Sequence, residues 1–309
     1  MNKCNIIMYH YVRPIKESKF PRINGLELNG FIRQINYFKN NGNFIDSSQL
    51  FNSLNYGKHI PSNSFLLTFD DGLKDHFSYV FPILKKNKIN GLFFPPLQPL
   101  YEKIVLPVHK IHFILEKNND EQKLFNKLFD LINFYKEEFN LESPKNYFDN
   151  LKFTSRFDSN KIEFIKKILQ KFLLKKPREL IINKLFEEFV SEDEKSFSEN
   201  LYMNIDEIKE MKEEGMFFGG HGYSHSWFTS LSSEQLEFEI QKCREFCQKI
   251  NQSNILIMCY PYGDFDKNVT KIAHDNGFEV GLTTEIGTSV LEKNKSMILP
   301  RFDTNDFPQ

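Results

Sequence analysis

The stretch LLTFDDGLKDH, residues 66–76, is an apolar run that stops at two adjacent carboxylates, Asp70 and Asp71, followed by Gly72. A short apolar run bounded by turn-forming residues is typical of a buried strand. On this stretch alone a solvated turn explains the two aspartates, because Asp-Asp-Gly is ordinary turn chemistry. A pair of functional carboxylates at the end of a strand is the alternative, and other parts of the sequence bear on the choice.

Strands and helices alternate around this stretch. Residues 5–12 (NIIMYHYV) form a first predicted strand, and residues 29–42 have apolar side chains at helical spacing. After Gly72, residues 76–89 predict another helix, and residues 90–96 (NGLFFPP) predict a strand that the two prolines end. This alternation favours a parallel sheet or barrel with helices outside it.

The pattern changes between residues 101 and 200, where long segments rich in Lys, Glu, Phe and Leu have apolar residues at helical spacing. The charges within them are expected on solvated helix faces. Alternation returns after residue 201, with a helix at 232–250 opened by a Ser and Glu capping arrangement. We therefore predict an α/β fold in which residues 1–100 and 201–309 form one discontinuous domain, and residues 101–200 form a helical insertion that serves as a lid or an oligomerisation element.

Composition excludes several function classes. The 309 residues contain 40 Lys and Arg against 41 Asp and Glu, so no global charge would attract nucleic acid or an anionic membrane. No apolar run approaches the length of a membrane span, and the N-terminus shows no signal-peptide pattern, so we expect a cytoplasmic location. The cysteines are expected to be reduced and packed, and they are Cys4, Cys243, Cys247 and Cys259. The 33 phenylalanines suggest aromatic-rich packing or an apolar surface.

A second motif, HGYSH, places His221 and His225 four residues apart after an apolar segment. On a helical turn this spacing would direct both imidazoles to one side, where they could share a divalent cation. With Asp71 they supply the three protein ligands that a catalytic zinc site uses. The metal would lower the pKa of its water, and Asp70, left uncoordinated, could take the proton as general base.

The motifs LTFDDG, GGHGYSH and CYPYGDFD, in this order, with IIMYHYV at the start and LPRFD at the end, resemble those of the polysaccharide deacetylase family. This is the NodB-homology domain, or carbohydrate esterase family 4, and the subgroup with N-terminal YHYV and YPYG motifs is the most similar. The resemblance covers residues 1 to about 100 and 201–309. It implies a distorted (β/α) barrel of the NodB-homology type, here with a helical insertion.

The resemblance also implies roles for individual residues. Asp70 matches the family's base, and the residues that match its metal ligands are Asp71, His221 and His225. Pro261 and Tyr262 match the groove-wall motif, in which the backbone N–H at Tyr262 would help to hold the oxyanion. One divalent metal is implied, most simply Zn²⁺, with Co²⁺, Ni²⁺ or Mn²⁺ as alternatives.

Two departures from the family pattern affect the site. Cys259 stands where many members have an arginine that orients the base, and Arg301 in LPRFD is our candidate for its replacement. A surface ion pair is the alternative role for Arg301. The late histidine that protonates the leaving amine is also missing, and His10 is the candidate acid, because imidazole titrates near neutral pH. His109 and His112 are expected to be structural.

The expected activity is metal-dependent removal of an N-acyl group, acetyl or formyl, from an amino sugar. The expected substrate is a nucleotide-linked, lipid-linked or oligosaccharide intermediate of surface-glycan biosynthesis, and a homo-oligomer could form through the insertion. Two alternatives stay open: a catalytically silent carbohydrate-binding protein on the same fold, and a metal amidase that acts on a non-sugar amide.

Overall fold

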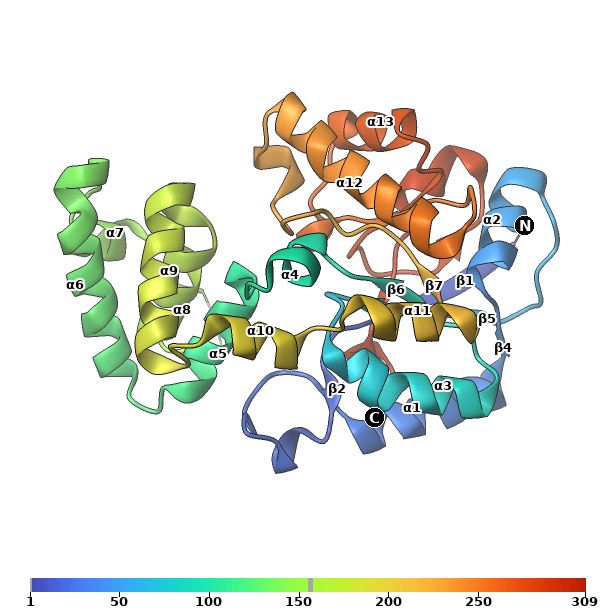
Figure 1. Ribbon diagram of the computed structural model, residues 1–309, viewed down its shortest axis with the longest axis horizontal. Coiled ribbons are helices and arrows are strands. Elements are labelled where there is room, and N and C mark those ends of the chain that lie inside the picture. The colour runs from blue at the N-terminus through green and yellow to red at the C-terminus, as the bar shows by residue number, and fades with distance from the viewer. Residues whose placement is uncertain (1, 155–157) are drawn as a thin grey trace. The chain divides into compact units, whose positions relative to one another are not determined.

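The computed structural model describes residues 2–154 and 158–309 and divides the chain into two compact units. Unit 1 contains Met1–Ser18, Asn24–Ile104 and Ser198–Gln309. Unit 2 contains Val105–Phe197 and also the short segment Lys19–Ile23. Figure 1 shows strands with surrounding helices in unit 1, whereas the labelled elements of unit 2 are all helices.

The strands of unit 1 follow one another around a distorted barrel. The main sheet has the order β10-β1-β5-β6-β7, with β11 beside β1 and β4 beside β5. After β7, Gly220 bridges Met258 of β8, β8 pairs with β9, and Leu282 of β9 bridges Leu299. The next strand, β11, pairs in parallel with β1, so the pairing returns to its start partly through single bridges. The bounds are β1 (Lys3–Tyr9), β4 (Asn43–Phe44), β5 (Ser64–Asp70), β6 (Leu92–Phe94), β7 (Phe217–Phe218), β8 (Ile257–Cys259), β9 (Val280–Leu282), β10 (Ser289–Val290) and β11 (Phe302–Asp303), with β2 (Val12–Arg13) and β3 (Leu26–Glu27) as a separate pair.

Helices connect these strands, as the alternating pattern predicted. The α-helices of unit 1 are α1 (Leu28–Asn41), α2 (Ser47–Tyr56), α3 (Phe81–Asn87), α4 (Leu97–Glu102), α11 (Ile205–Glu213), α12 (Ser233–Asn251) and α13 (Lys267–Asp275). Short helical turns are η1 (Ile15–Glu17), η2 (His76–Val80), η4 (Phe228–Ser230), η5 (Pro261–Gly263), η6 (Lys293–Ile298) and η7 (Thr304–Asp306). The α/β class and the barrel type expected from the sequence are confirmed.

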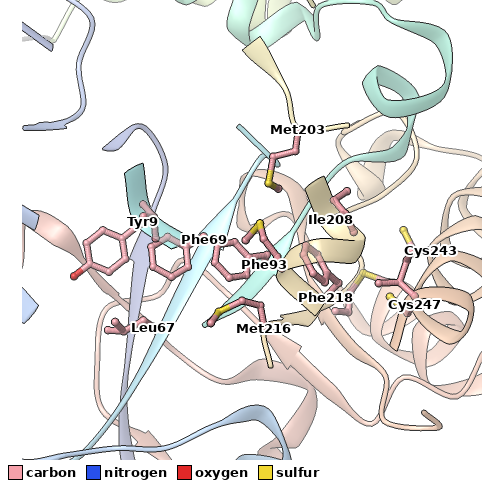
Figure 2. Close-up of a cluster of buried hydrophobic side chains, with 14 of the residues drawn as sticks. Tyr9, Leu67, Phe69, Phe93, Met203, Ile208, Met216, Phe218, Cys243 and Cys247 are labelled. Carbon is pink, nitrogen blue, oxygen red and sulfur yellow. The ribbon is translucent and has the colours of Figure 1, made fainter. Parts of the chain in front are cut away.

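One aromatic side chain from each of four successive strands forms a buried row inside unit 1 (Figure 2). Tyr9, Phe69, Phe93 and Phe218 occupy paired positions of β1, β5, β6 and β7. Their successive ring centroids are 5.1, 4.7 and 5.7 Å apart, within the range of favourable aromatic contacts. Tyr9 and Phe69 are paired in register, so the residues that follow them, His10 and Asp70, lie at the same end of the sheet.

Unit 2 is a group of helices with its own apolar interior, which includes Leu124, Leu128, Phe164 and Leu185. Its elements are α5 (Pro107–Lys117), α6 (Glu121–Phe139), α7 (Pro144–Asn150), α8 (Asn160–Lys167), a single π-helical turn η3 (Ile168–Phe172) and α9 (Lys175–Phe189), while α10 (Glu194–Leu201) crosses the boundary between the units. Within the described residues, no helix combines the length and apolar character that crossing a bilayer requires.

Three local predictions differ from the structure in detail. The strand expected over residues 5–12 stops at Tyr9, because Val12 and Arg13 pair with β3 instead. The helix expected at 76–89 starts as the π-helical η2 before α3. The capping box of α12 pairs Ser232 with Gln235, while Glu234 accepts a hydrogen bond from Ser232 Oγ at 2.8 Å.

Candidate active site

Asp70 is the last residue of β5, and the chain then turns sharply. Asp71 and Gly72 have φ angles of 73° and 62°, in the left-handed region that is costly for most residues other than glycine. A Cβ at Gly72 would lie 2.7 Å from Cβ and 2.9 Å from Cα of Pro95, so a glycine is required here. Backbone strain of this kind at Asp71 is typical of functional sites. The two carboxylates consequently leave the strand end in different directions.

Asp71 meets His221 and His225 in one buried cluster. Asp71 Oδ1 lies 3.5 Å from Nε2 of His221 and 3.3 Å from Nε2 of His225. One donor atom from each residue lies within 4.8 Å of the others. Ligands that surround a tetrahedral zinc at about 2.0–2.1 Å lie about 3.3–3.4 Å from each other, so these separations and this donor set fit a divalent metal.

The histidine motif is a loop and not the helical turn that its spacing suggested. Gly222 and His225 have φ angles of 74° and 55°, which interrupt any helical path. His221 Nδ1 donates a hydrogen bond to the carbonyl oxygen of Cys259 at 2.8 Å, which leaves Nε2 directed at Asp71. Such a bond fixes the tautomer that a metal-binding histidine needs. Burial would lower the pKa of His221, but Cys259, Asp71 and Asp70 outweigh burial and raise it, so a proton competes with a metal for this ring.

Asp70 is held by Arg301, which is only 1% exposed. The guanidinium donates to both carboxylate oxygens, from Nη1 to Oδ1 at 2.9 Å and from Nη2 to Oδ2 at 2.8 Å. Arg301 also donates to the carbonyl oxygen of Thr283 at 2.8 Å and to Thr68 Oγ1 at 3.1 Å. The structure thus brings Arg301 to Asp70 as a two-pronged, buried pair, the geometry in which arginine binds carboxylate most strongly.

Cys259 completes the surroundings of this pair. Its Sγ lies 3.2 Å from Nη2 of Arg301 and 3.4 Å from Oδ2 of Asp70. Burial is the largest single influence on the pKa of Asp70 and pushes it up, but Arg301, with smaller contributions from His221 and His10, lowers it to about 2. Asp70 is therefore ionised at neutral pH, and the arginine that the motif lacks at position 259 reaches it from position 301.

His10 lies at the same strand end but is more exposed. Its Nε2 is 3.9 Å from Oδ2 of Asp70, and its side chain is 42% exposed. The carbonyl oxygen of His10 bonds to Nε2 of the buried His76 at 2.9 Å. His10 is therefore anchored through its backbone, while its ring lies beside Asp70 and in contact with solvent.

The YPYG segment lies against the cluster of Asp71, His221 and His225. The Tyr262 ring contacts the His225 ring at a centroid distance of 4.5 Å, and Trp227 stacks on Tyr262 at 4.3 Å with only 5° between the planes. Pro261 is buried, and Tyr262 has a φ of 59°. By contrast, His109 and His112 belong to α5 of unit 2, with their rings 5.8 Å apart.

Glu239 is a residue of this site that the sequence analysis missed. Its buried carboxylate, on α12, accepts hydrogen bonds from the backbone N–H groups of Tyr223 at 2.6 Å and Ser224 at 2.9 Å, and from Ser224 Oγ at 2.5 Å. It thereby holds the loop between His221 and His225. The sequence did contain a signal for this residue. Glu239 is a charged residue on the apolar helix face to which Leu236 and Cys243 belong.

We expect Glu239→Gln to weaken metal binding about 10- to 100-fold, as is typical when a group that orients metal ligands is lost. The amide keeps one acceptor oxygen but has an NH₂ group in place of the other, so the three hydrogen bonds that the loop donates can no longer all be accepted and the two histidines lose their fixed spacing. Competition titration of the metal-free protein with a chromophoric chelator measures this effect. Glu245→Gln, an exposed change on the same helix, is the matched control, and equal affinities of both variants would contradict the positioning role.

Comparisons with known proteins match part of the chain by sequence and nearly all of it by structure. The family model described as polysaccharide deacetylase matches residues 193–281, which include both histidines and the YPYG motif. The putative polysaccharide deacetylase YxkH of Bacillus subtilis (strain 168) is 24% identical over 95 residues, which span 31% of this chain and only 34% of that relative.

Solved structures give the wider comparison. The Streptococcus pyogenes deacetylase PplD in complex with acetate has a TM-score of 0.62 at 16% identity, over 98% of this chain and 92% of that one. The de-N-acetylase from Aggregatibacter actinomycetemcomitans has a TM-score of 0.56 at 15% identity, over 98% and 96%. IcaB from Ammonifex degensii has a TM-score of 0.55 at 16% identity, over 98% and 91%. The expected resemblance is confirmed: residues 193–281 match the polysaccharide deacetylase family model, and the whole chain has the fold of these deacetylases.

Proposed function

We propose that this protein is a metal-dependent hydrolase that removes an N-acyl group, acetyl or formyl, from an amino sugar. The observation that carries the proposal is the buried set Asp71, His221 and His225 beside a second carboxylate, Asp70, which Arg301 holds ionised. Three ligands with an adjacent base are what metal-assisted hydrolysis of an amide by water uses. The deacetylases with this fold support the same reaction class.

In this proposal Asp71, His221 and His225 would hold one divalent ion, Zn²⁺ or alternatively Co²⁺, Ni²⁺ or Mn²⁺. When bound, that ion would lower the pKa of water and polarise the acyl carbonyl. Asp70 accepts the proton of the water that attacks the acyl carbon, and Arg301 keeps both carboxylate oxygens in place during this step. The backbone N–H of Tyr262 would donate to the oxyanion, with Pro261 shaping the same turn. His10 would protonate the amine as the C–N bond breaks, so that the acid and the amine are released.

The substrate proposed is a nucleotide-linked, lipid-linked or oligosaccharide intermediate of surface-glycan assembly. A cytoplasmic location is part of the proposal, and the free, buried state of Cys4, Cys243, Cys247 and Cys259 supports a reducing compartment. The roles of residues 101–200 as a lid or in a homo-oligomer stay predictions.

The test measures acetate and formate released from a panel of N-acylated amino sugars, free and nucleotide-linked, with N-acetyl peptides as matched non-sugar amides. We expect release from the sugars only, loss of release after chelation, and recovery on addition of Zn²⁺ or Co²⁺. Faster release from the peptides would favour the amidase alternative. No release from any substrate by metal-loaded protein would favour a silent carbohydrate-binding protein.

A further inference from the structure

The start of α9 lacks the side-chain cap that three other helices of unit 2 have, although α5, which begins after Leu106, lacks one as well. The helices α6, α7 and α8 begin at Asp120, Ser143 and Ser159, whose side chains each accept a hydrogen bond from the first turn. Helix α9 begins after Leu174, which offers no such bond. An apolar residue at this position forgoes a cap that helices favour strongly.

The charges at this helix start also oppose folding. Residues 164–178 contain six basic residues and no acidic one, although the whole chain has a net charge of only −1. Lys175 and Lys176 occupy the first turn of α9, where no acidic residue is present. Cations are disfavoured there, because the helix N-terminus carries partial positive charge. Lys166 and Lys167 of this segment pair with Asp158 and Glu163.

Two large apolar side chains lie among these cations. Phe172 is 55% exposed and Leu174 is 66% exposed, while Leu173 between them is buried. The chain reaches them through η3, a single π-helical turn of the kind often found at functional sites. We name this surface the basic corner, and its residues are Lys171, Phe172, Leu174, Lys175, Lys176 and Arg178.

We propose that the basic corner binds the surface of an anionic lipid bilayer. The cations would lie among the phosphate groups of the lipids, and Phe172 and Leu174 would enter the boundary between headgroups and acyl chains. The uncapped helix start, the unfavourable charges and the exposed apolar side chains each lower the stability of the protein in water. Their coincidence within eight residues is expected where a function, and not stability, determines which residues are present.

The same residues argue against other occupants. A soluble polyanion would satisfy the cations but leave Phe172 and Leu174 in water. A second copy of the corner would bring like charges together. A bilayer with acidic headgroups satisfies both the charge and the apolar surface, and the proposal is independent of the reaction at the metal cluster.

The test is flotation of the full chain with vesicles of phosphatidylcholine alone or mixed with phosphatidylglycerol. We expect binding only to the mixed vesicles, weakening as salt rises. Lys175→Gln should weaken binding about fivefold, since each cation near such a surface contributes about 1 kcal/mol. The double change Phe172→Ser with Leu174→Ser should abolish flotation. Leu174→Ser adds a capping residue, so the thermal unfolding midpoint of that single variant should not fall.

Matched controls lie outside the corner. Lys184→Gln removes an exposed cation from the same helix, and Ile286→Ser removes an exposed apolar side chain from unit 1. Both should float as the wild type does. Equal binding to pure phosphatidylcholine, heparin binding without vesicle binding, or wild-type flotation by the double serine variant would each overturn the proposal.

Discussion

Asp70→Asn is expected to lower kcat/KM about a thousandfold, within the range that a general base contributes, while the protein still binds one metal ion. The amide is nearly the same size as the carboxylate but cannot accept a proton from water. Asp71, His221 and His225 are unchanged, so metal content should stay at the wild-type level. Steady-state kinetics together with elemental analysis of the same sample measure both quantities.

Because Asp70→Asn leaves Arg301 buried without a counter-charge, stability needs its own control. Asp75→Asn removes the partner of Arg13, whose Nε lies 2.6 Å from the Asp75 carboxylate in another largely buried ion pair of unit 1. We expect Asp75→Asn to lose stability but keep its activity per folded molecule. Full turnover by metal-loaded Asp70→Asn would show that Asp70 is not the base.

His10→Ala tests the proposed acid, His10, separately from the proposed base, Asp70. In His10→Ala no side chain at this position can protonate the leaving amine, so kcat should fall while metal content stays at the wild-type level. Steady-state kinetics and elemental analysis of the variant measure both quantities. An unchanged rate would remove His10 from the mechanism.

The sequence predicted the elements of this site better than their arrangement. The strand ending at Asp70 and the helices that alternate with the strands follow from local patterns, which carry most of the information about single elements. The pairing of β11 with β1, which carries Arg301 toward Asp70, joins residues almost 300 positions apart and has no local signature. For this reason Arg301 could be proposed from its motif, but its two-pronged contact could not.

The HGYSH motif shows a different limit. Spacing of four suggested a helical turn, yet the left-handed backbone of Gly222 and His225 forms a loop that Glu239 holds from a separate helix. Helical and looped backbones can both bring such histidines together, so spacing alone could not choose between them. The sequence analysis also missed helix α2. Its clear signals are only the capping box of Asp46 and Gln49 and the Gly57 that ends the helix.

Arg301→Met is expected to have the largest effect on stability, about 3–5 kcal/mol, because it leaves Asp70 charged and buried without a partner. Methionine has a similar length and fills the apolar part of the space. Arg301→Lys keeps one charge but cannot donate to both carboxylate oxygens, so its loss should be intermediate. Chemical denaturation of the metal-free proteins at neutral pH gives these free energies of unfolding.

A double-mutant cycle measures the interaction free energy between Asp70 and Arg301 separately from the contribution of each residue alone. If the cost in each single variant comes from an uncompensated buried charge, Asp70→Asn with Arg301→Met should be more stable than the sum of the two losses implies. Additive losses would mean that Arg301 stabilises the fold through Thr283 and Thr68 instead.

The dependence of stability on pH should reverse its sign in Arg301→Met. In the wild type the pKa of Asp70 lies near 2, below its ordinary 3.8, so the pair's stabilisation is complete above about pH 4 and is lost as pH falls through 2. Without Arg301, burial dominates and raises the pKa of Asp70 above its ordinary value. That variant should therefore be most stable in acid and lose stability as pH rises toward neutrality. Denaturation curves of both proteins between pH 4 and 7 measure the difference, and parallel pH profiles would mean that Arg301 does not control the ionisation of Asp70.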